Sequence, residues 1–419
     1  MTSAISETSL YVGLYPTGAA SPATAALLKL ERSGPRESGH FAYGLGYLDS
    51  PGAQPLNPLH LPLRREPFAL TPRLMRDGGA LPLTLKDALP DAWGRLVVSR
   101  QLDGRIPDDR ELLLLTNDDR VGAMVFSETR AMPTPAEPAH DDLAQLAEAV
   151  RRVQYDMEIP AALRRLLQRG GSLGGARPKA SFLQDHVLWL AKFPAAGDPV
   201  NVQTLEAVAM ALAMRCGIKI PQFRVMPLAN GETAFLSRRF DRVANDSRQR
   251  LHFLSAAALL DIPYESSKGS YVEFAQVLRR LSLAPRADLE ELFRRMVFNL
   301  LIDNSDDHLK NHGMLDAGNG RYRLSPAYDV VPQLTNLGYQ MLSIDGTTHE
   351  SHLDLAIQAA PHFDLSPDQG AAIVRKLADI VYRGWRLNAK VMRVPDGLRK
   401  RLESCFRRQG EIVGAGRYG

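Results

Sequence analysis

The chain has 419 residues, of which 45% are hydrophobic and 23% are charged, values close to the average for folded soluble proteins. This composition excludes disordered and collagen-like proteins, and the length predicts about two or three packed domains. The 51 basic and 47 acidic residues leave a net charge of +4, which permits contact with nucleic acids without arguing for it.

The two cysteines, Cys216 and Cys405, stand far apart in the sequence and outside any spacing typical of metal ligands. We therefore expect neither a disulfide framework nor a zinc site, which fits a reducing cytoplasm. Residues 1–7 lack a basic region followed by an apolar core, and no run of about 18 apolar residues occurs. The expectation is a cytoplasmic protein that is neither secreted nor membrane-spanning.

The N-terminal part, residues 10–126, mixes short strand-like runs with Pro/Gly breaks and one helix that is expected to start near Asp91. Three prolines then fall between residues 133 and 138 among small and charged neighbours, a composition typical of linkers. We therefore predict a small mixed subdomain over residues 1–132.

Residues 143–250 are predicted to form a second, strand-bearing domain. Runs of apolar and β-favouring residues predict two hairpins, and apolar residues at helical spacing, followed by Gly217, predict a helix between them. The expected elements are strands 179–184 and 187–193 around Asp185-His186, a helix over 205–216, and strands 222–227 and 233–239 around Asn230-Gly231.

From residue 251 onward the pattern is mainly helical, and residues 251–419 form the third predicted domain. Apolar residues make one continuous stripe over 289–301, and Asp288 with Glu291 is predicted to cap the start of that helix. Residues 364–418 also favour helices with connecting loops. The whole chain is therefore expected to have an α+β fold.

A polar run, residues 304–311, follows this apolar helix. Phosphoryl transfer needs a carboxylate to accept the proton of the substrate hydroxyl, and an amide or carboxylate oxygen to hold Mg²⁺ nearby. Asp306 and Asn311 supply both groups, and their separation of five positions equals that in the protein-kinase catalytic loop. Asp329, in a later acidic segment, is the candidate for a second Mg²⁺ ligand. Taken singly, these signals are weak, because such residues usually belong to a solvated loop or a capped turn.

Lys192 lies late in an apolar predicted strand, where burial of an unpaired ammonium group would be costly. Glu206, on the following helix, could pair with it and hold it against the α- and β-phosphates of ATP, as the strand Lys and helix Glu do in kinases. Alternatively, the long side chain of Lys192 reaches past the end of the strand into solvent.

A glycine-rich run, residues 170–179, stands directly before the first strand of the second domain. Glycines let backbone N–H groups approach phosphate oxygens closely. The run matches neither Walker A nor G-x-G-x-x-G, and it is also compatible with a flexible loop. The order is more specific than any single feature, because glycine loop, strand Lys, helix Glu, Asp with Asn, and a further Asp follow one another as in kinases.

These segments resemble the HipA-type kinases, the serine/threonine kinase toxins of bacterial toxin-antitoxin pairs, in their glycine loop, strand Lys, S/T-D-x-H-x-K-N catalytic loop and Y-D metal motif. The resemblance extends to residues 85–93, 118–123 and 237–242, and so covers about 61–382. It implies a protein-kinase-like, two-lobed fold with a small N-terminal coupling subdomain, a strand-bearing N-terminal lobe and a mainly helical C-terminal lobe. ATP is expected in the cleft between the lobes.

Carried over residue by residue, the resemblance implies that Asp306 is the catalytic base and that Asn311 and Asp329 bind Mg²⁺. Lys192, supported by Glu206, would bind the phosphates of ATP.

The resemblance also implies further nucleotide-binding residues. They are the phosphate loop Gly174, Gly175, Ala176, Arg177, Pro178 and Lys179; Arg238, Arg239 and Phe240 beside the adenine; Asp241 near the ribose; and His308 and Tyr328 lining the pocket. Ser172 aligns with the autophosphorylation site of the family. The chain departs from the best-known members in its loop, which reads Gly-Gly-Ala-Arg-Pro-Lys in place of A-G-A-Q-E-K, and at Arg238, where those members have an acidic residue.

The implied substrate is a serine or threonine of a cellular protein, in known family cases an aminoacyl-tRNA synthetase, whose phosphorylation inhibits growth. A small helix-turn-helix antitoxin, HipB-like, would bind and restrain the kinase, and DNA would be reached through that partner; no membrane partner is expected. Two alternatives remain. A small-molecule kinase of the aminoglycoside or choline type shares the spacing of Asp and Asn, and a non-catalytic scaffold could bind antitoxin and DNA, although every expected catalytic residue is in place.

Overall fold

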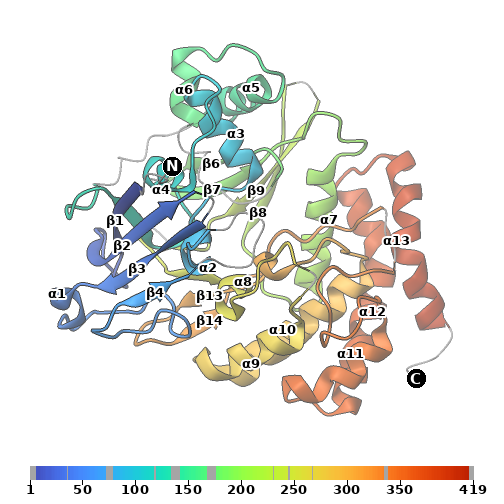
Figure 1. Cartoon of the computed structure of the whole chain (residues 1–419). Helices are drawn as coiled ribbons and strands as arrows, with labels where there is room; N and C mark the ends of the chain where they lie inside the picture. Colours follow the sequence, from blue (N-terminus) through green and yellow to red (C-terminus); the bar gives the residue numbers. More distant parts are fainter. Residues whose placement is uncertain are drawn as a thin grey trace. The chain divides into compact units, whose positions relative to one another are not determined.

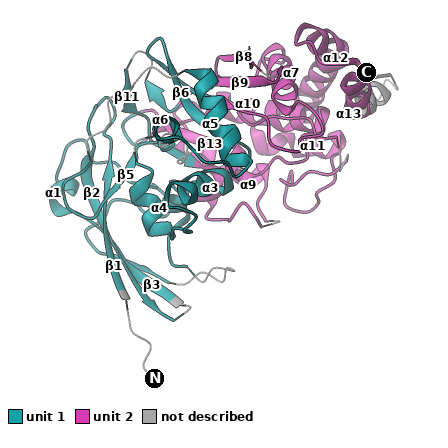
Figure 2. Cartoon of the chain, turned by 90° about the horizontal axis from the view of Figure 1, so that it is seen from above, with its two compact units in different colours: residues 1–190, 241–254, 318–320 teal, residues 191–240, 255–317, 321–419 magenta. Residues whose placement is uncertain are grey.

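The protein is described by a computed structural model. It covers residues 6–34, 36–71, 79–117, 119–133, 142–167, 176–229, 231–243, 246–266, 268–334 and 338–414. The chain divides into two compact units (Figure 2). Unit 1 consists of residues 1–190, 241–254 and 318–320, and unit 2 consists of residues 191–240, 255–317 and 321–419.

Five strands among the described residues of unit 1 form an antiparallel sheet in the order β4-β3-β2-β1-β5 (Figure 1). The strands are β1 (Ser6–Leu14), β2 (Ala23–Ser33), β3 (Arg36–Tyr43), β4 (Phe68–Leu70) and β5 (Met124–Ser127). Buried and exposed residues alternate from Leu28 to Glu31 of β2, as expected for a strand with one face on a core. Val12, Leu28 and Phe41 contribute to that core from three adjacent strands.

The remaining elements of unit 1 are mostly short helices. The described helices are α1 (Leu45–Leu48), α2 (Leu83–Lys86), α3 (Ala92–Gln101), α4 (Asp109–Leu115), α5 (Leu143–Gln154) and α6 (Ala161–Leu167). The further strands are β6 (Lys179–Gln184), β10 (Arg242–Val243) and β11 (Asp246–Arg250). The predicted helix near Asp91 is confirmed as α3, for which Asp91 is the N-cap residue.

Unit 2 is mainly helical after residue 255. Its described helices are α7 (Val202–Arg215), α8 (Ala256–Leu260), α9 (Tyr271–Leu281), α10 (Pro285–Leu301), α11 (Leu353–Ala359), α12 (Pro367–Val391) and α13 (Asp396–Gly414), with the 3-10 turns η1 (Leu309–Asn311) and η2 (Ala360–Phe363). Its strands include the antiparallel hairpins β8 (Phe223–Pro227) with β9 (Thr233–Arg238) and β13 (Gly313–Asp316) with β14 (Tyr322–Leu324). The chain crosses between units within β7 (Val187–Lys192) and β12 (Phe253–Ser255).

Helix α10 lies at the centre of unit 2, where it contacts α9, α11 and α12 (Figure 1). Leu289, Phe293, Met296 and Val297 of its predicted apolar stripe are fully buried. Full burial of each such side chain stabilises the fold by about 1.5–3 kcal/mol relative to exposure. The stripe therefore anchors the helix that leads directly into the polar run at residues 304–311.

The hairpins and the helix predicted over residues 179–239 are confirmed, with strand bounds that differ by one residue at most. Asp185 and His186 both have positive φ, at 51° and 60°, which is the conformation that a two-residue hairpin turn requires. Gly217 ends α7 with a φ of 76°. Gly231 belongs to the β8–β9 turn, whereas Asn230 lies outside the described residues.

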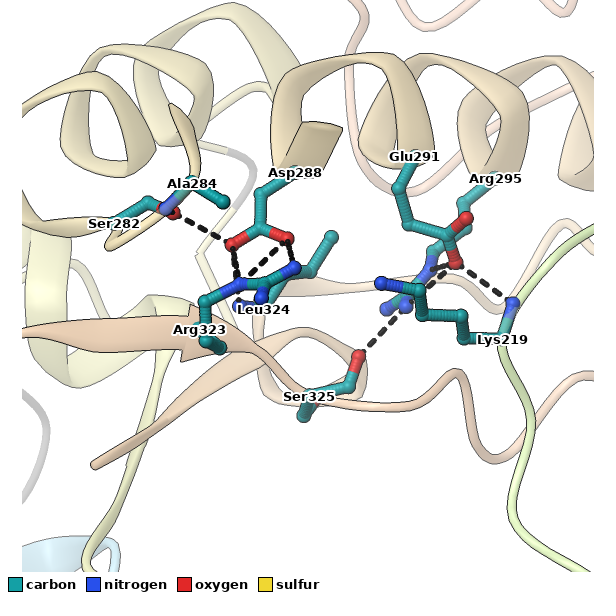
Figure 3. A network of polar contacts seen from close by, with 9 residues as sticks. All are labelled: Lys219, Ser282, Ala284, Asp288, Glu291, Arg295, Arg323, Leu324 and Ser325. Carbon is teal, nitrogen blue, oxygen red and sulfur yellow. Dashed lines mark hydrogen bonds and ion pairs between the residues drawn. The ribbon is translucent and has the colours of Figure 1, made fainter. Parts of the chain in front are cut away.

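The predicted cap of the long apolar helix is wrong. Helix α10 begins at Pro285 after the N-cap residue Ala284, so Asp288 lies inside the first turn and does not cap it. Proline at the first helical position supplies the start signal. Asp288 is instead 1% exposed and forms an ion pair with Arg323 of β14 at 2.9 Å (Figure 3).

The predicted three-domain division differs from the two units in that residues 143–190 belong to unit 1 together with the predicted subdomain 1–132. The three-domain division stays a prediction, and most of the proposed linker, residues 134–141, lies outside the described residues. Every helix within the described ranges is too short or too polar to cross a membrane.

Candidate active site

Lys192, the last residue of β7, is joined to two acidic side chains of unit 2. Its Nζ donates to Glu206 Oε1 on α7 at 2.6 Å and to Asp329 Oδ1 at 2.7 Å. The side chains of Lys192 and Glu206 are 9% and 4% exposed, whereas that of Asp329 is 44% exposed. The strand Lys and helix Glu predicted to pair therefore lie in contact, and an accessible carboxylate completes the group.

The electrostatics of this group keep Lys192 charged. Burial by itself would lower the pKa of Lys192, but the negative charges of Asp329 and Glu206 outweigh it and raise this pKa above its usual range. The alternative in which Lys192 reaches past its strand into solvent does not describe this side chain, which is buried and paired. A fixed ammonium group beside an accessible carboxylate can bind a phosphate and a cation together.

The predicted catalytic loop follows the end of α10 and is held by backbone contacts just before Asp306. The carbonyl oxygen of Asp303 accepts from the N–H of Gln333 at 3.0 Å, and that of Ser305 accepts from the N–H of Met341 at 3.1 Å. Asp306 itself is exposed, although its chain neighbours Ser305 and Asp307 are buried. The carboxylate of Asp306 thus reaches solvent from an anchored backbone.

Asn311 and Asp329 fit a Mg²⁺ site of the kind that also uses phosphate and water oxygens. Asn311 Nδ2 donates to the carbonyl oxygen of Asp306 at 3.4 Å, which orients the amide so that Oδ1 is the atom left for a cation. Asp329, at a φ of 57°, presents a carboxylate, and carboxylate and amide oxygens suit Mg²⁺. The described residues hold no cluster of three or more His, Cys, Asp or Glu ligands, and Mg²⁺ does not require one.

Behind Asp306, the buried carboxylate of Asp307 is enclosed by donors. The hydroxyl of Tyr271 on α9 donates to Asp307 Oδ2, and His312 Nε2 lies 3.0 Å from Asp307 Oδ1. Asn299 Nδ2 of α10 donates to the Tyr271 oxygen at 3.0 Å. Burial, followed by the charge of Asp307, raises the pKa of Tyr271 well above its usual value, so the phenol stays protonated and remains a donor.

The segment that leads to Asp329 is bound to side chains of α10 (Figure 3). Arg295 Nη2 donates to the carbonyl oxygen of Ser325 at 2.6 Å and to Glu291 Oε1 at 2.9 Å. Asp288 Oδ2 accepts from the N–H of Leu324 at 3.0 Å. Burial alone would raise the pKa of Asp288, but hydrogen bonds led by that from Arg323 outweigh it and lower this pKa. Asp288 therefore stays ionised beside β14.

Aromatic side chains predicted to line the nucleotide pocket lie next to the catalytic loop. The Tyr328 hydroxyl donates to the carbonyl oxygen of Lys310 at 2.6 Å, and its ring centroid lies 5.3 Å from that of Phe240. The ring of His308 lies 5.1 Å from that of Tyr264. Within unit 2 the structure thus brings Phe240, Tyr328 and the loop together.

The remaining predicted nucleotide-binding residues have other surroundings. Arg238 Nη1 donates to Gln222 Oε1 at 3.3 Å, and Arg239 is buried. Asp241 belongs to unit 1, where its Oδ2 accepts from the N–H of Gly122 at 2.8 Å and from Arg242 Nη1 at 2.7 Å. This arrangement favours a structural role for Asp241, and its place near the ribose stays a prediction.

The predicted phosphate loop is described only in part. Ala176 and Arg177 are exposed, Pro178 and Lys179 are buried, and the carbonyl oxygen of Lys179 accepts from Trp93 Nε1 at 2.7 Å. Gly174 and Gly175 of this loop, and the predicted autophosphorylation site Ser172, lie outside the described residues.

Sequence reasoning missed Arg295 and Asn299 and assigned Asp288 and Glu291 to a helix cap, although all four are buried polar residues that support the site. Asp288, Glu291, Arg295 and Asn299 recur at intervals of three or four residues in a helix that was interpreted as an apolar stripe. Such spacing places them on one helical face. That periodicity was the available signal, although the partners of the four residues could not be inferred from it.

Two family models match the chain. One, described as the HipA-like C-terminal domain, matches residues 171–385, and the other, described as the HipA N-terminal domain, matches residues 25–127. Two similar proteins come from Sinorhizobium fredii (strain NBRC 101917 / NGR234). "Putative kinase Y4mE" is 27% identical over 326 residues, 72% of this chain and 73% of that protein. "Putative kinase Y4dM" is 30% identical over 159 residues, 34% of this chain and 37% of that protein.

Among solved structures, a chain of the Shewanella oneidensis MR-1 toxin-antitoxin complex of HipA, HipB and operator DNA matches with a TM-score of 0.68. The match covers 97% of each chain at 15% sequence identity, which shows a shared fold. The expected α+β, kinase-like fold is therefore confirmed. Because the C-terminal family model alone covers residues 171–385, more than half of the 419 residues, this chain belongs to the HipA family.

Proposed function

We propose that this chain is an ATP- and Mg²⁺-dependent protein kinase that phosphorylates serine or threonine residues. The observation that carries the proposal is the contact of Lys192 Nζ with Glu206 at 2.6 Å and with Asp329 at 2.7 Å. Protein kinases use a strand Lys paired with a helix Glu to hold the phosphates of ATP, beside an Asp that holds Mg²⁺. Membership of the HipA family and the two relatives named as kinases support the same function.

In the proposed reaction, the oxygen of the acceptor hydroxyl forms a bond to the γ-phosphorus of ATP, the bond to the bridging oxygen breaks, and ADP leaves. Asp306 accepts the hydroxyl proton, a role that its exposed side chain and anchored backbone support. Lys192 binds the α- and β-phosphates, and Asn311 with Asp329 holds the metal. Mg²⁺, when bound, supplies positive charge that offsets the charge developing on the phosphates.

The rest of the nucleotide site is proposed from the family resemblance together with local contacts. Phe240 would lie beside the adenine with Arg238 and Arg239. Tyr328, whose ring centroid lies 5.3 Å from that of Phe240, would line the same pocket together with His308. The loop Gly174–Lys179 would bind phosphates through its backbone N–H groups.

We also propose that the kinase is the toxin of a toxin-antitoxin pair in the cytoplasm, restrained by a HipB-like antitoxin through which it reaches DNA. The shared fold with the Shewanella oneidensis complex supports this partner. An aminoacyl-tRNA synthetase is the candidate substrate that the resemblance suggests. Ser172 is proposed as an autophosphorylation site, where a phosphate would add about −1.5 to −2 charges beside the loop that receives ATP and would inactivate the enzyme.

The test is to incubate the protein with γ-labelled ATP, Mg²⁺ and a cell lysate, and to identify the labelled product by mass spectrometry. Label on serine or threonine of a protein, absent with the Asp306→Asn variant, is the expected result. Label in the small-molecule fraction would replace the proposal with an aminoglycoside- or choline-type kinase. Nucleotide binding without any transfer would replace it with a non-catalytic scaffold.

A further inference from the structure

Four polar residues of α10, namely Asp288, Glu291, Arg295 and Asn299, form what we call the polar face of α10. Each is less than 7% exposed. Buried charges and amides are costly unless they are paired or hydrogen-bonded, so three charges and one amide on one central helix require partners. Some of their partners lie on the segments that lead to the proposed catalytic and metal-binding residues, and others, Tyr271 and Lys219, are themselves bonded to those segments.

One end of the polar face holds the catalytic loop. Asn299 Nδ2 donates to the Tyr271 oxygen at 3.0 Å, and Tyr271 donates to Asp307, the residue that follows Asp306. Asn299 Oδ1 also accepts from Asn304 Nδ2 at 3.3 Å, so both polar atoms of this amide are directed to the loop. Because Asp307 is 1% exposed, its fixed position limits where the exposed carboxylate of Asp306 can lie.

The other end holds the segment that precedes Asp329 (Figure 3). Arg295 binds the carbonyl oxygen of Ser325, and Glu291 Oε1 accepts from the N–H of Lys219 at 2.9 Å. The carbonyl oxygen of Lys219 in turn accepts from the N–H of Ala327 at 2.8 Å. The backbone is thereby held only two residues before Asp329.

A small pocket lies where these elements meet. It is lined by Arg295 and Asn299 of the polar face, by Asp307 and Asn311 of the loop, and by Tyr328 next to Asp329. Residues of all three elements thus surround one space. The loop and the segment are connected across it by the hydrogen bonds of the polar face, together with the direct bond from the Tyr328 hydroxyl to the carbonyl oxygen of Lys310.

We propose that the polar face of α10 is a positioning element that fixes the catalytic loop and the Asp329 segment relative to each other. The proposal rests on the proposed kinase function for its kinetic consequences, but the positioning itself is a property of the protein without nucleotide. Proton acceptor and metal ligand must be held to within a fraction of an ångström for phosphoryl transfer, and buried hydrogen bonds from one rigid helix provide this.

Two mild variants test the two ends of the polar face separately. Tyr271→Phe removes the hydroxyl that links Asn299 to Asp307 and keeps the ring, whereas Arg295→Lys keeps the charge but loses the planar fork that reaches both Glu291 and Ser325. Arg294→Lys is the matched control, since Arg294 pairs with Glu290 at the same i, i+4 spacing on a less buried side of the same helix.

Hydrogen exchange of the nucleotide-free protein is the first measurement. Tyr271→Phe is expected to speed exchange in residues 303–312 by about tenfold with little change in 322–331, and Arg295→Lys is expected to do the reverse. The control should change neither segment. Equal loosening of both segments by both variants, or no change in either, would overturn the proposal and leave the polar face with a general stabilising role.

Steady-state kinetics and nucleotide titrations give the second measurement. Tyr271→Phe should lower kcat by about tenfold with KM for Mg·ATP nearly unchanged, and Arg295→Lys should mainly weaken binding of Mg·ATP relative to metal-free ATP. If the wild-type protein transfers no phosphoryl group, the proposed function fails, while the exchange pattern still decides the positioning proposal.

Discussion

Each unit of this molecule contains a cluster of buried charges, and the two clusters differ in the groups that accept their hydrogen bonds. In unit 1, Arg120, Arg242 and Arg250 donate to backbone carbonyl oxygens of Leu113, Arg120 and Asn117 at 2.8, 2.9 and 3.0 Å. Burial, and then the charge of Arg250, lowers the pKa of Arg120 to about 9, so the guanidinium stays charged at neutral pH. These contacts tie chain segments together.

In unit 2, Lys192 donates to two carboxylates, of which Asp329 is 44% exposed. The carboxylate of Asp241 in unit 1 is 3% exposed and is occupied by Gly122 and Arg242. A buried charge therefore does not identify an active site by itself. An accessible carboxylate attached to a buried cluster is the feature that distinguishes unit 2.

The largest expected effect is on catalysis in unit 2. Asp306→Asn should lower phosphoryl transfer by about 10²- to 10⁴-fold, because it removes a positioned proton acceptor, with ATP affinity and thermal stability nearly unchanged at an exposed side chain. A labelled-ATP assay and thermal unfolding measure the two quantities. Undiminished transfer would show that Asp306 takes no part in the reaction. The catalytic role assigned to unit 2 would then lose its main support.

The corresponding change in unit 1 should act on stability. Asp241→Ala leaves Arg242 buried without its carboxylate and is expected to cost about 3–5 kcal/mol in the free energy of unfolding. Urea titration measures this. Asp246→Ala is the control, since Asp246 forms an exposed pair with Arg248 and its loss should cost less than about 1 kcal/mol.

Nucleotide affinity tests the other role of Asp241. If the folded Asp241→Ala protein binds ATP more weakly while its stability is unchanged, Asp241 contacts the nucleotide, as predicted from the family resemblance. The buried cluster of unit 1 would then be functional, and it would no longer differ in this respect from the cluster of unit 2.

A smaller effect is expected from Asp329→Ala, which removes the accessible member of the unit 2 cluster. Lys192 keeps Glu206, so stability should change little, whereas the affinity for Mg·ATP should fall by about tenfold or more. Calorimetric titration with and without Mg²⁺ checks this. Equal losses in the two titrations would place Asp329 outside the metal site.

Much of the fold could be predicted from the sequence because its signals are local. Turn chemistry and spacing over a few residues predict the hairpins that turn at Asp185-His186 and at Gly231. They also predict the helix end at Gly217. The start of α10 was misplaced because Asp288 and Glu291 match a capping pattern, whereas Pro285 gives the start and Asp288 is used by a strand 35 residues away.

Residues of the candidate site that carry a local sequence signal were predictable, and residues whose role depends on distant partners were not. The spacing of Asp306 and Asn311 and the strand position of Lys192 carry chemical information by themselves. The role of Asp307 depends on Tyr271, 36 positions earlier in the chain, and no local pattern indicates which polar groups a fold brings together over such a distance.

The smallest expected effect comes from Glu206→Gln, which keeps the shape of the side chain and an oxygen that can accept from Lys192. Asp329 still pairs with Lys192, so the ammonium group keeps one carboxylate, and the loss of stability should be about 1 kcal/mol, the difference between a charged and a neutral hydrogen bond. ATP affinity should fall by about threefold, because one of the two contacts that orient Lys192 becomes weaker.

Glu290→Gln is the matched control for Glu206→Gln, since Glu290 pairs with Arg294 on a less buried side of α10 and should contribute less than about 0.5 kcal/mol. Urea titration and nucleotide titration of both variants give the comparison. If Glu206→Gln behaves like Glu290→Gln in both, the buried contact does not hold Lys192 for ATP. If Glu206→Gln lowers stability without lowering ATP affinity, as is expected for Asp241→Ala, the cluster of unit 2 has a structural role like that of unit 1.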